Sequence, residues 1–458
     1  MAEKTVYIGS GAGFAGDRID AGLPVVRTLA RCDGPRYLIF EVMGERTLAI
    51  AQRIRMNNPD LGYSPYLEPY LRGVLKEAKA SGVRIVANLG NANPLGGAKR
   101  TLELAQELGV EDLRVAVVLG DDLLGFMTGD DIAALPTIEG VSISGKEIVA
   151  ANAYLGARPV ARALALDTDV VLVGRSTDAA LVLGPLIHEY GWAEDDWDRL
   201  AAGTLAGHLL ECGGQITGGY FCDPGFKDVP GLDDLGFPIG EISADGGIVI
   251  TKAEDTGGLV NKATVTEQIL YEMHDPAAYL TPDVTLDVTG VSLEDTGRDR
   301  VRIRGAKGHP PPDTLKVTVS ADGGWLGEAE MTYAGPNALA RAQLAADIVK
   351  TRLRRNGVAD PLRVEVVGTG AAFDNDDADR ARGANRPADG EYRLRAAVRT
   401  ADKATAQYLT DEVQSLFCSG PAGGGGYRGS VTGQVNTASS LVPRGPVEAQ
   451  ARVQEVTS

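Results

Sequence analysis

Polar residues that could carry acid–base or oxyanion chemistry stand directly behind short apolar runs. Glu41 ends one such run and Asn88 ends another, with Asn91 and Asn93 close behind. A carboxyl group at the end of an apolar strand is partly desolvated, which raises its pKa and suits it to acid–base catalysis. Side-chain amides can stabilise an oxyanion without carrying charge.

We therefore predict Glu41 as the acid–base group and Asn88, Asn91 or Asn93 as oxyanion donors. An ion pair between Glu41 and an arginine is the alternative for the carboxyl group. Turns and helix caps are the alternative for the asparagines, since these residues favour both.

A glycine-rich loop follows the first predicted strand. Its Gly11-x-Gly13-x-x-Gly16 spacing is the literal fingerprint of a dinucleotide-binding turn. In that fold a helix begins inside the glycine motif, whereas Pro24 delays a regular helix here until about Leu23. We therefore expect these glycines to contact a different ligand or to serve only a tight turn. A nicotinamide-dependent dehydrogenase remains an alternative function.

Arginines beside these strand ends could bind an anion. Arg18 follows the first glycine loop with Asp17 beside it, so it could clamp a carboxylate or phosphate, or form a local ion pair. Arg175 and Ser176 follow the apolar run 170–173. An arginine beside a capping hydroxyl suits an anion or a simple helix cap. All four residues are substrate-binding candidates.

A second glycine-rich loop, residues 419–428, contains consecutive glycines. Ordering so many glycines is costly in conformational entropy, so we expect close approach to a ligand or to the first glycine loop. A flexible linker is the alternative. The substrate-binding candidates here are Gly424, Gly425 and Arg428.

Neither the four histidines nor the four cysteines are spaced for a metal site or a disulfide framework. Asp121 and Asp122 are adjacent carboxylates without a nearby histidine, which is weak evidence for a cation. We predict no metal site and assign no cofactor. The cysteine usage is typical of a reducing, cytoplasmic compartment.

Charge and composition limit the classes of function. The formal charge of −17 argues against broad contact with nucleic acid or with an anionic membrane surface. No apolar run approaches the roughly 18 residues of a membrane helix, so we expect a cytoplasmic protein. Large acidic metabolic enzymes are often symmetric, and we expect a homo-oligomer.

The order of apolar runs predicts an α/β protein with two domains in its 458 residues. Strand-like and helical patterns alternate over residues 1–260, which predicts a mainly parallel sheet, with a long irregular segment near 204–260. Residues 261–435 are expected to form an α+β domain, because they mix strands with helical periodicity. Residues 436–458 are expected to be a solvated tail.

Several segments carry a resemblance to a known family; they are Gly11–Arg18, Tyr37–Glu41 with Glu45–Thr47, Asn93–Gly97, Leu183–Trp192, Gly213–Phe221, His274–Asp283, Asp313–Val317 and Ser419–Gly426. Over roughly residues 5 to 445 the chain resembles the acyclic terpene utilisation (AtuA) family. The resemblance implies a component of citronellol and geraniol catabolism, among enzymes that carboxylate, hydrate and cleave branched acyl-CoA thioesters. Some members are extended by a small ferredoxin-like domain. This chain ends before such a domain, so a small ferredoxin-like partner subunit is expected.

These features together predict an enzyme that acts on a branched, terpenoid-like carboxylic acid or its CoA thioester. The expected reaction is hydration, dehydration or carbon–carbon cleavage next to a carbonyl. Arg18, Arg175 or Arg428 would neutralise the acid or the CoA phosphates. The alternative is a non-catalytic or assembly subunit of an acyl-CoA-processing complex, although converging polar strand ends favour a ligand site.

Overall fold

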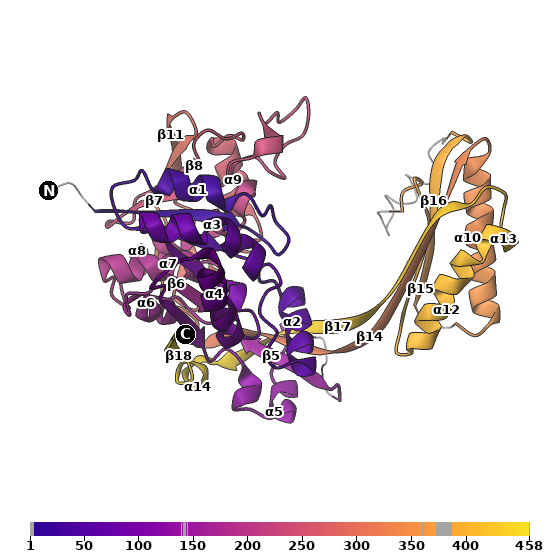
Figure 1. The fold of residues 1–458 in the computed structure, drawn as a ribbon, viewed down its shortest axis with the longest axis horizontal. Helices are drawn as coiled ribbons and strands as arrows, with labels where there is room; N and C mark the ends of the chain where they lie inside the picture. Colours follow the sequence, from indigo (N-terminus) through magenta and orange to yellow (C-terminus); the bar gives the residue numbers. More distant parts are fainter. Residues whose placement is uncertain are drawn as a thin grey trace. The chain divides into compact units, whose positions relative to one another are not determined.

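The chain folds into two compact units in the computed structural model, which describes residues 4–138, 140, 143, 145–358, 361–371 and 387–457. Unit 1 is Met1–Ser320 together with Thr437–Ser458, and unit 2 is Ala321–Asn436 (Figure 1). This division differs from the boundary expected after residue 260, because the residues that follow add strands to the sheet of unit 1. The expected tail also belongs to unit 1, since it contains a strand of the same sheet.

Unit 1 is built on a ten-stranded sheet. Its middle strands are parallel, in the order β1 (Thr5–Ala12), β2 (Arg36–Phe40), β3 (Arg84–Ala87), β6 (Val170–Val173) and β4 (Val115–Leu119). Antiparallel strands extend the sheet beyond β1 and β4; they are β7 (Pro238–Ser243), β8 (Ile248–Lys252), β12 (Arg300–Arg304), β11 (Ser292–Gly297) and, beyond β4, β18 (Arg452–Val456). The sheet is therefore mixed, and the expected mainly parallel order holds only for its middle.

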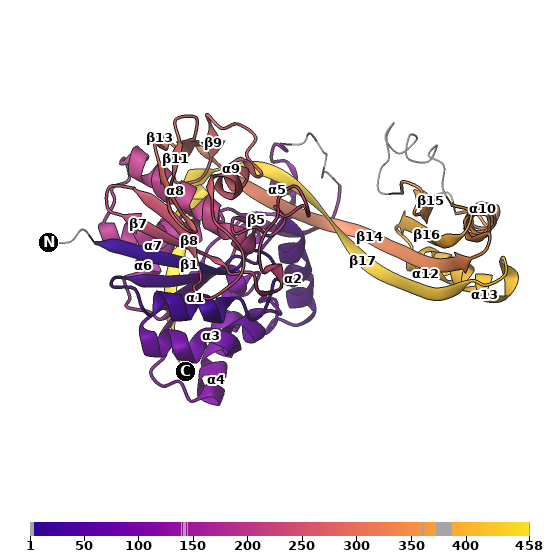
Figure 2. The ribbon, with the colours of Figure 1, turned by 90° about the horizontal axis from the view of Figure 1, so that it is seen from above.

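Helices cover both faces of this sheet, because its parallel strands are apolar on both sides. In β2, Tyr37 and Ile39 pack into one buried cluster, whereas Leu38 and Phe40 pack into another. The first cluster contains residues of α6 (Arg158–Leu164), α7 (Ala180–Tyr190) and α8 (Trp197–Glu211). The second contains residues of α1 (Gly22–Leu29), α3 (Leu67–Ser81) and α4 (Pro94–Leu108). Figure 2 shows α1, α3 and α4 on the opposite side of β1 from α8.

Shorter elements complete unit 1. The helices are α2 (Glu45–Asn57), α5 (Gly129–Ala133), α9 (Lys262–Leu270) and α14 (Arg444–Glu448). The 3-10 turns are η1 (Asn88–Gly90), η2 (Leu123–Gly125), η3 (Gly213–Gln215) and η4 (Leu232–Asp234). β9 (Tyr279–Leu280), β10 (Thr285–Asp287) and β13 (Lys307–His309) form a small sheet, and β5 (Ile148–Ala153) pairs with β14 (Thr314–Gly335). Within the described ranges, no helix is both long enough and apolar enough to cross a membrane.

The segment expected to be irregular, 204–260, contains regular structure at both ends. Helix α8 runs to Glu211, and every residue in it from Leu200 onward is buried. A helix buried on all sides lacks the amphipathic period by which helices are recognised in a sequence. Strands β7 and β8 lie at the other end, so the irregular part is mainly 212–237.

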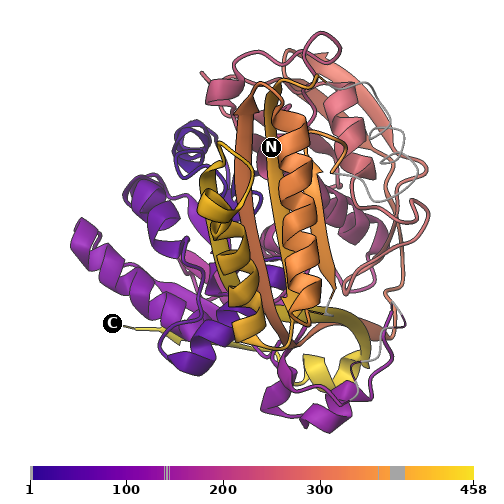
Figure 3. The ribbon, with the colours of Figure 1, turned by 90° about the vertical axis from the view of Figure 1, so that its right-hand side faces the viewer.

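Unit 2 has a helical layer on an antiparallel sheet of order β15 (Leu362–Val367), β16 (Gly390–Thr400), β14, β17 (Gly425–Pro443). Along the chain its described elements are β14, α10 (Ala338–Arg355), β15, β16, α12 (Lys403–Gln414), α13 (Leu416–Ser419) and β17. This β-α-β-β-α-β order is the ferredoxin-like arrangement. Figure 3 shows α10 and α12 side by side on one face of the sheet. The expected α+β character is therefore present, with different boundaries.

Candidate active site

The carboxyl ends of neighbouring parallel strands bring several predicted site residues together. Glu41 follows β2, Asn88 follows β3 and Arg175 lies just beyond β6. Because β2, β3 and β6 are adjacent and parallel, the three residues emerge at one edge of the sheet. The first glycine loop reaches the same edge, since the backbone N–H of Glu41 donates to the carbonyl of Ala12 at 3.1 Å.

Glu41 is buried and held in place by hydrogen bonds. Asn88 Nδ2 donates to Glu41 Oε1 at 2.7 Å, and the backbone N–H of Met43 donates to the same oxygen at 3.0 Å. Burial and the nearby charge of Asp178 raise the pKa of Glu41 to about 8, although Arg175 and Asn88 oppose the shift. Glu41 is therefore mostly protonated at neutral pH and can donate a proton.

Asn88 positions this carboxyl group. Its Oδ1 accepts a hydrogen bond from the backbone N–H of Val42 at 2.8 Å, while its Nδ2 donates to Glu41. One N–H of the amide is thus committed to Glu41 rather than to an oxyanion. The predicted oxyanion role would have to use the remaining N–H of the same amide.

Arg175 is a buried cation beside Glu41. Its guanidinium lies 4.1 Å from the centre of the Tyr154 ring, and its Nη2 donates to Asp178 Oδ1 at 2.5 Å. Its Nη1 donates to the carbonyl of Met43. Burial opposes the charge, but Asp178, Tyr154 and Glu41 outweigh burial and raise the pKa of Arg175, so the guanidinium stays charged.

Three buried polar atoms at this edge have no hydrogen-bond partner within the described residues: Asn91 Oδ1, Arg175 Nε and Ser176 Oγ. They lie in the segments that follow the adjacent strands β3 and β6. Asn91 also has a φ of +47°, which is costly for a residue with a side chain. An unpaired buried polar group costs about 1–3 kcal/mol, so a water or a ligand that pairs with these atoms would stabilise this edge of the sheet.

A second carboxyl group, Glu45, has the opposite electrostatic environment. Tyr154 OH donates to Glu45 Oε1 at 2.5 Å and Lys316 Nζ donates to it at 3.1 Å. Burial favours the neutral form of Glu45, but these donors and the charge of Lys316 outweigh burial and lower its pKa to about 2. Glu45 is therefore ionised when Glu41 is protonated. Environments that separate two carboxyl pKa values are typical of acid–base sites.

Asn93 caps a helix. Its Oδ1 accepts from the backbone N–H of Gly96 at 3.0 Å, at the start of α4. Its Nδ2 donates to the carbonyls of Pro59 at 3.0 Å and Leu61 at 2.9 Å. The amide is fully engaged with the backbone, so the structure supports the capping alternative for this residue.

The first glycine loop turns and packs closely. A Cβ on Gly11 would lie 2.6 Å from the Phe40 ring, and one on Gly13 would lie 2.3 Å from the backbone of Cys212. Gly16 has a φ of +98°. Helix α1 begins only at Gly22, so no helix N-terminus lies inside the glycine motif. These contacts explain the glycines without a dinucleotide.

The charged residues of this loop are engaged locally. Asp17 accepts from the backbone N–H of Gly13 at 2.9 Å and that of Arg18 at 2.8 Å. Arg18 pairs with Asp20 at 3.0 Å and donates to the carbonyl of Leu235 at 3.1 Å. These contacts favour a local ion pair for Arg18 over an anion clamp.

The second glycine loop belongs to unit 2, whereas Glu41 and Arg175 belong to unit 1. A Cβ on Gly424 would lie 3.2 Å from Tyr333 OH and 3.3 Å from Met331, both in unit 2. Gly425 and Arg428 lie on β17. A side chain at Gly424 would thus crowd residues of its own unit. Gly424, Gly425 and Arg428 stay predicted binding residues, and no contact ties them to the strand-end site within the described residues.

Sequence reasoning missed Tyr154, Lys316 and the roles of Glu45 and Asp178. Tyr154 follows β5 and Lys316 lies on β14, and only the pairing of these strands brings them together. The backbone N–H of Tyr154 donates to the carbonyl of Lys316 at 2.9 Å. Among the described residues, no group of three or more histidine, cysteine or acidic residues is arranged to hold a metal ion.

Comparison with known proteins gives one match. The family model described as "Acyclic terpene utilisation family protein AtuA" matches residues 6–453, nearly the whole chain, which confirms the resemblance. Searches of curated proteins and of solved structures found no match.

Proposed function

This chain belongs to the acyclic terpene utilisation family, and we propose that it is an enzyme that adds or removes water next to the carbonyl of a branched carboxylic acid or its CoA thioester. Carbon–carbon cleavage at the same position uses the same groups and is the closest variant. The observation that carries the proposal is a buried carboxyl group with a raised pKa beside a buried arginine whose Nε has no partner within the described residues.

Glu41 transfers the proton in this proposal. In the dehydration direction its carboxylate takes a proton from the carbon next to the carbonyl and then gives that proton to the departing hydroxyl group, which leaves as water. In the hydration direction the carboxylate takes a proton from the attacking water and delivers it to the same carbon. A pKa of about 8 suits both steps near neutral pH, because neither the acid nor the base form is rare. Asn88 holds the carboxyl group in one orientation.

Arg175 and Ser176 stabilise negative charge that develops on the carbonyl oxygen. Both have a buried donor without a partner, namely Nε of Arg175 and the hydroxyl of Ser176. Donors that are fixed before the reaction stabilise an oxyanion strongly in a site shielded from water. Asp178, together with Tyr154 and the ionised Glu45, keeps the guanidinium charged.

Deuterium exchange tests the proposal without knowledge of the reaction direction. The protein is incubated in D2O with branched 3-hydroxy and 2-enoyl acids and their CoA thioesters, and mass spectrometry detects deuterium or water added next to the carbonyl. We expect Glu41→Gln to slow exchange at least about 100-fold. Glu254→Gln is the matched control, because that residue is exposed and, among the described residues, its side chain pairs with Arg31.

Two results would contradict the proposal. Full activity in Glu41→Gln would remove the acid–base role of Glu41. A lack of exchange and of product with every acid and thioester would favour a non-catalytic subunit instead, and a stoichiometric protein partner in pull-downs would then be sought.

A further inference from the structure

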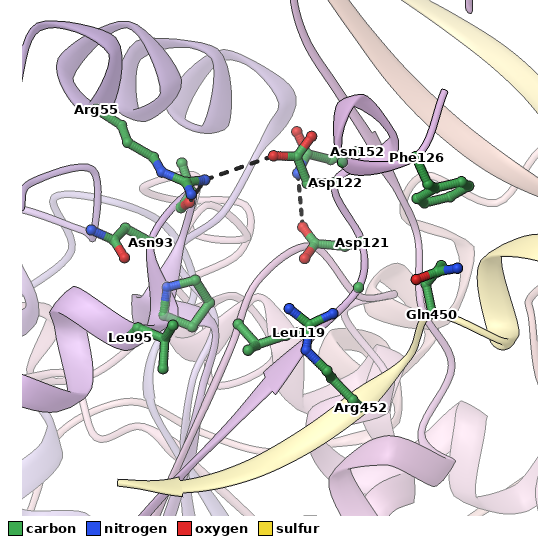
Figure 4. A pocket seen from close by; sticks show the side chains of 14 residues that line it. Arg55, Asn93, Leu95, Leu119, Asp121, Asp122, Phe126, Asn152, Gln450 and Arg452 are labelled. Atoms are coloured by element: carbon green, nitrogen blue, oxygen red, sulfur yellow. Dashed lines mark hydrogen bonds and ion pairs between the residues drawn. The ribbon is translucent and has the colours of Figure 1, made fainter. Parts of the chain in front are cut away.

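A pocket of about 270 Å³ lies next to the strand-end site in unit 1 (Figure 4). Its walls come from the segments after β3 and β4, from α2 and β5, and from β18. Asp121 connects the two places, since its Oδ2 accepts from the backbone N–H of Arg175 at 2.9 Å. The pocket wall is therefore one hydrogen bond away from the segment that carries Arg175 and Ser176.

Most charges on the pocket wall are compensated. Arg55 lies 3.7 Å from Asp122 and donates to the carbonyl of Ala92 at 2.7 Å. Asp122 also caps η2 through the backbone N–H of Leu124. Asp121 accepts from Asn152 Nδ2 at 2.8 Å, in addition to Arg175. Figure 4 shows the Arg55–Asp122 and Asn152–Asp121 interactions as dashed lines.

Arg452 is different. It lies on β18 at the pocket wall and is an exposed residue, and within the described parts of the chain its side chain has neither an ion pair nor a hydrogen bond. Helix α4 adds positive potential at the other wall, because its first residues, Pro94 and Leu95, line the pocket and a helix N-terminus favours anions. An unpaired guanidinium opposite a helix N-terminus is suited to an anion.

The rest of the wall is apolar and sets the size of the ligand. Leu95, Leu119 and Phe126 line the pocket between the charged groups. The volume of about 270 Å³ is just below the roughly 300–1,000 Å³ of sites that hold drug-sized ligands. A short acid fits such a space, whereas a whole CoA thioester does not.

We propose that this pocket binds a short carboxylate with an apolar body, with Arg452 pairing with the carboxylate and Leu95, Leu119 and Phe126 contacting the body. This inference goes beyond the proposed function, because Glu41, Arg175 and Ser176 do not line the pocket.

Calorimetric titration tests the binding without turnover. The probe is 3-methylbutanoate, and 3-methylbutanamide is the uncharged analogue of the same shape. We expect the acid to bind more tightly than the amide, and Arg452→Gln to weaken acid binding by about tenfold or more, since a charge-assisted pair is lost. The amide should bind equally to both proteins. The matched control is Arg298→Gln, whose side chain is 95% exposed.

A second variant guards against an effect of Arg452→Gln on strand β18. Leu95→Trp fills the apolar part of the pocket from a side chain that is already 40% exposed, and it should weaken both probes. Equal binding of acid and amide, or unchanged acid binding in Arg452→Gln, would overturn the inference. So would the absence of any binding up to the solubility limit of the acid.

The outcome is separable from that of the proposed function. Glu41→Gln should bind 3-methylbutanoate as the wild-type protein does, because Glu41 does not line the pocket. Binding that depends on Arg452, without deuterium exchange on any acid, would support this inference and contradict the enzyme. Deuterium exchange together with unchanged 3-methylbutanoate binding in Arg452→Gln would support the enzyme and contradict this inference.

Discussion

Glu41 and Glu45 are the same residue type four positions apart, yet their environments drive their pKa values in opposite directions. Glu41 is buried and lies near the charge of Asp178. Glu45 is 42% exposed and accepts hydrogen bonds from Tyr154 and Lys316. The chemistry of the site therefore depends on which strands surround each carboxyl group rather than on the residue type itself.

The raised pKa of Glu41 predicts a specific dependence of stability on pH. Its pKa is 4.5 in the unfolded chain and about 8 in the folded one, so between these values the folded protein binds more protons. The free energy of unfolding should therefore fall as pH rises from 5 to 8, by up to about 1.4 kcal/mol per pH unit from this group. Glu41→Gln should remove that part of the slope.

Urea denaturation at pH 5 to 8 measures this slope. Other buried carboxyl groups contribute to it, since burial raises the pKa of Asp121 to about 6 and that of Glu211 to about 7. The relevant quantity is thus the free energy of unfolding of Glu41→Gln minus that of wild type. This difference should increase as pH rises from 5 to 8, because only wild type loses the contribution of Glu41. The exposed control Glu254→Gln should show no such growth, and a constant difference for Glu41→Gln would contradict the raised pKa.

Tyr154→Phe is predicted to change the acid side of the stability curve. The variant loses the hydroxyl that donates to Glu45 but keeps the ring against Arg175. Glu45 has a folded pKa of about 2, below its unfolded 4.5, so it contributes stability above pH 4.5 that is lost as pH falls toward 2. Without the hydroxyl this contribution shrinks.

The free energy lost between pH 6 and pH 3 should therefore be smaller in Tyr154→Phe than in wild type. We expect a difference of about 1 kcal/mol or less, since Glu45 is partly exposed and screened. Tyr220→Phe is the control, because Tyr220 is 88% exposed. An identical acid loss in Tyr154→Phe would show that the hydroxyl does not set the charge of Glu45.

At the scale of elements, the segment from β3 to α4 gives its three asparagines three different tasks. Asn88 orients Glu41, and Asn93 caps α4. Asn91 has a positive φ, and its side-chain Oδ1 has no hydrogen-bond partner within the described residues. The sequence marks Asn93 as a cap, because Pro94 is typical of the first position of a helix. It cannot separate Asn88 from Asn91, since the role of Asn88 arises from its hydrogen bonds to Glu41 and Val42, which follow β2.

Asn93→Ala is predicted to destabilise the protein without slowing chemistry. The change removes the cap of α4 and two hydrogen bonds to the carbonyls of Pro59 and Leu61. We expect a loss of about 2 kcal/mol in the free energy of unfolding, measured by urea denaturation. The exchange rate of folded protein should stay within about twofold. A slower rate at unchanged stability would restore the predicted oxyanion role.

The elements that could be predicted from the sequence are those whose patterns are local. The delayed start of α1 and the strands that end at Glu41 and Asn88 agree with the structure. Helix α8 was missed because it is buried on all sides, and β18 because its role comes from pairing with β4. The spacing of the first glycine motif is typical of a ligand-binding loop. In the structure, Gly13 instead allows close contact with the backbone of Cys212, which is 199 positions later in the chain.

At the scale of the whole molecule, each unit has its own hydrophobic core. The two large buried clusters of unit 1 contain no residue between 321 and 436, and the cluster of unit 2 lies entirely inside that range. The chain leaves unit 1 along β14 and returns along β17, which pairs with β14. A domain boundary was hard to see in the sequence because both crossings occur inside strands.

Excision of unit 2 is therefore predicted to leave unit 1 folded. The two strands are adjacent where the crossings occur, since a Cβ on Gly323 would lie 3.0 Å from the backbone of Gln434. Residues 324–433 can thus be replaced by an Asn-Gly hairpin turn, which matches the twist of paired antiparallel strands. The shortened protein should keep a cooperative thermal transition and bind 3-methylbutanoate through Arg452 as the full chain does.

The comparison separates the two parts of the molecule. Circular dichroism and calorimetry of the shortened protein report the fold, and deuterium exchange reports the chemistry. A cooperative transition with lost exchange would mean that unit 2 supplies part of the reaction, which would give Gly424, Gly425 and Arg428 a role in it. Loss of the transition itself would contradict the independence of the two cores. If the cores are independent, burial within unit 1 alone is enough to hold unit 1 folded.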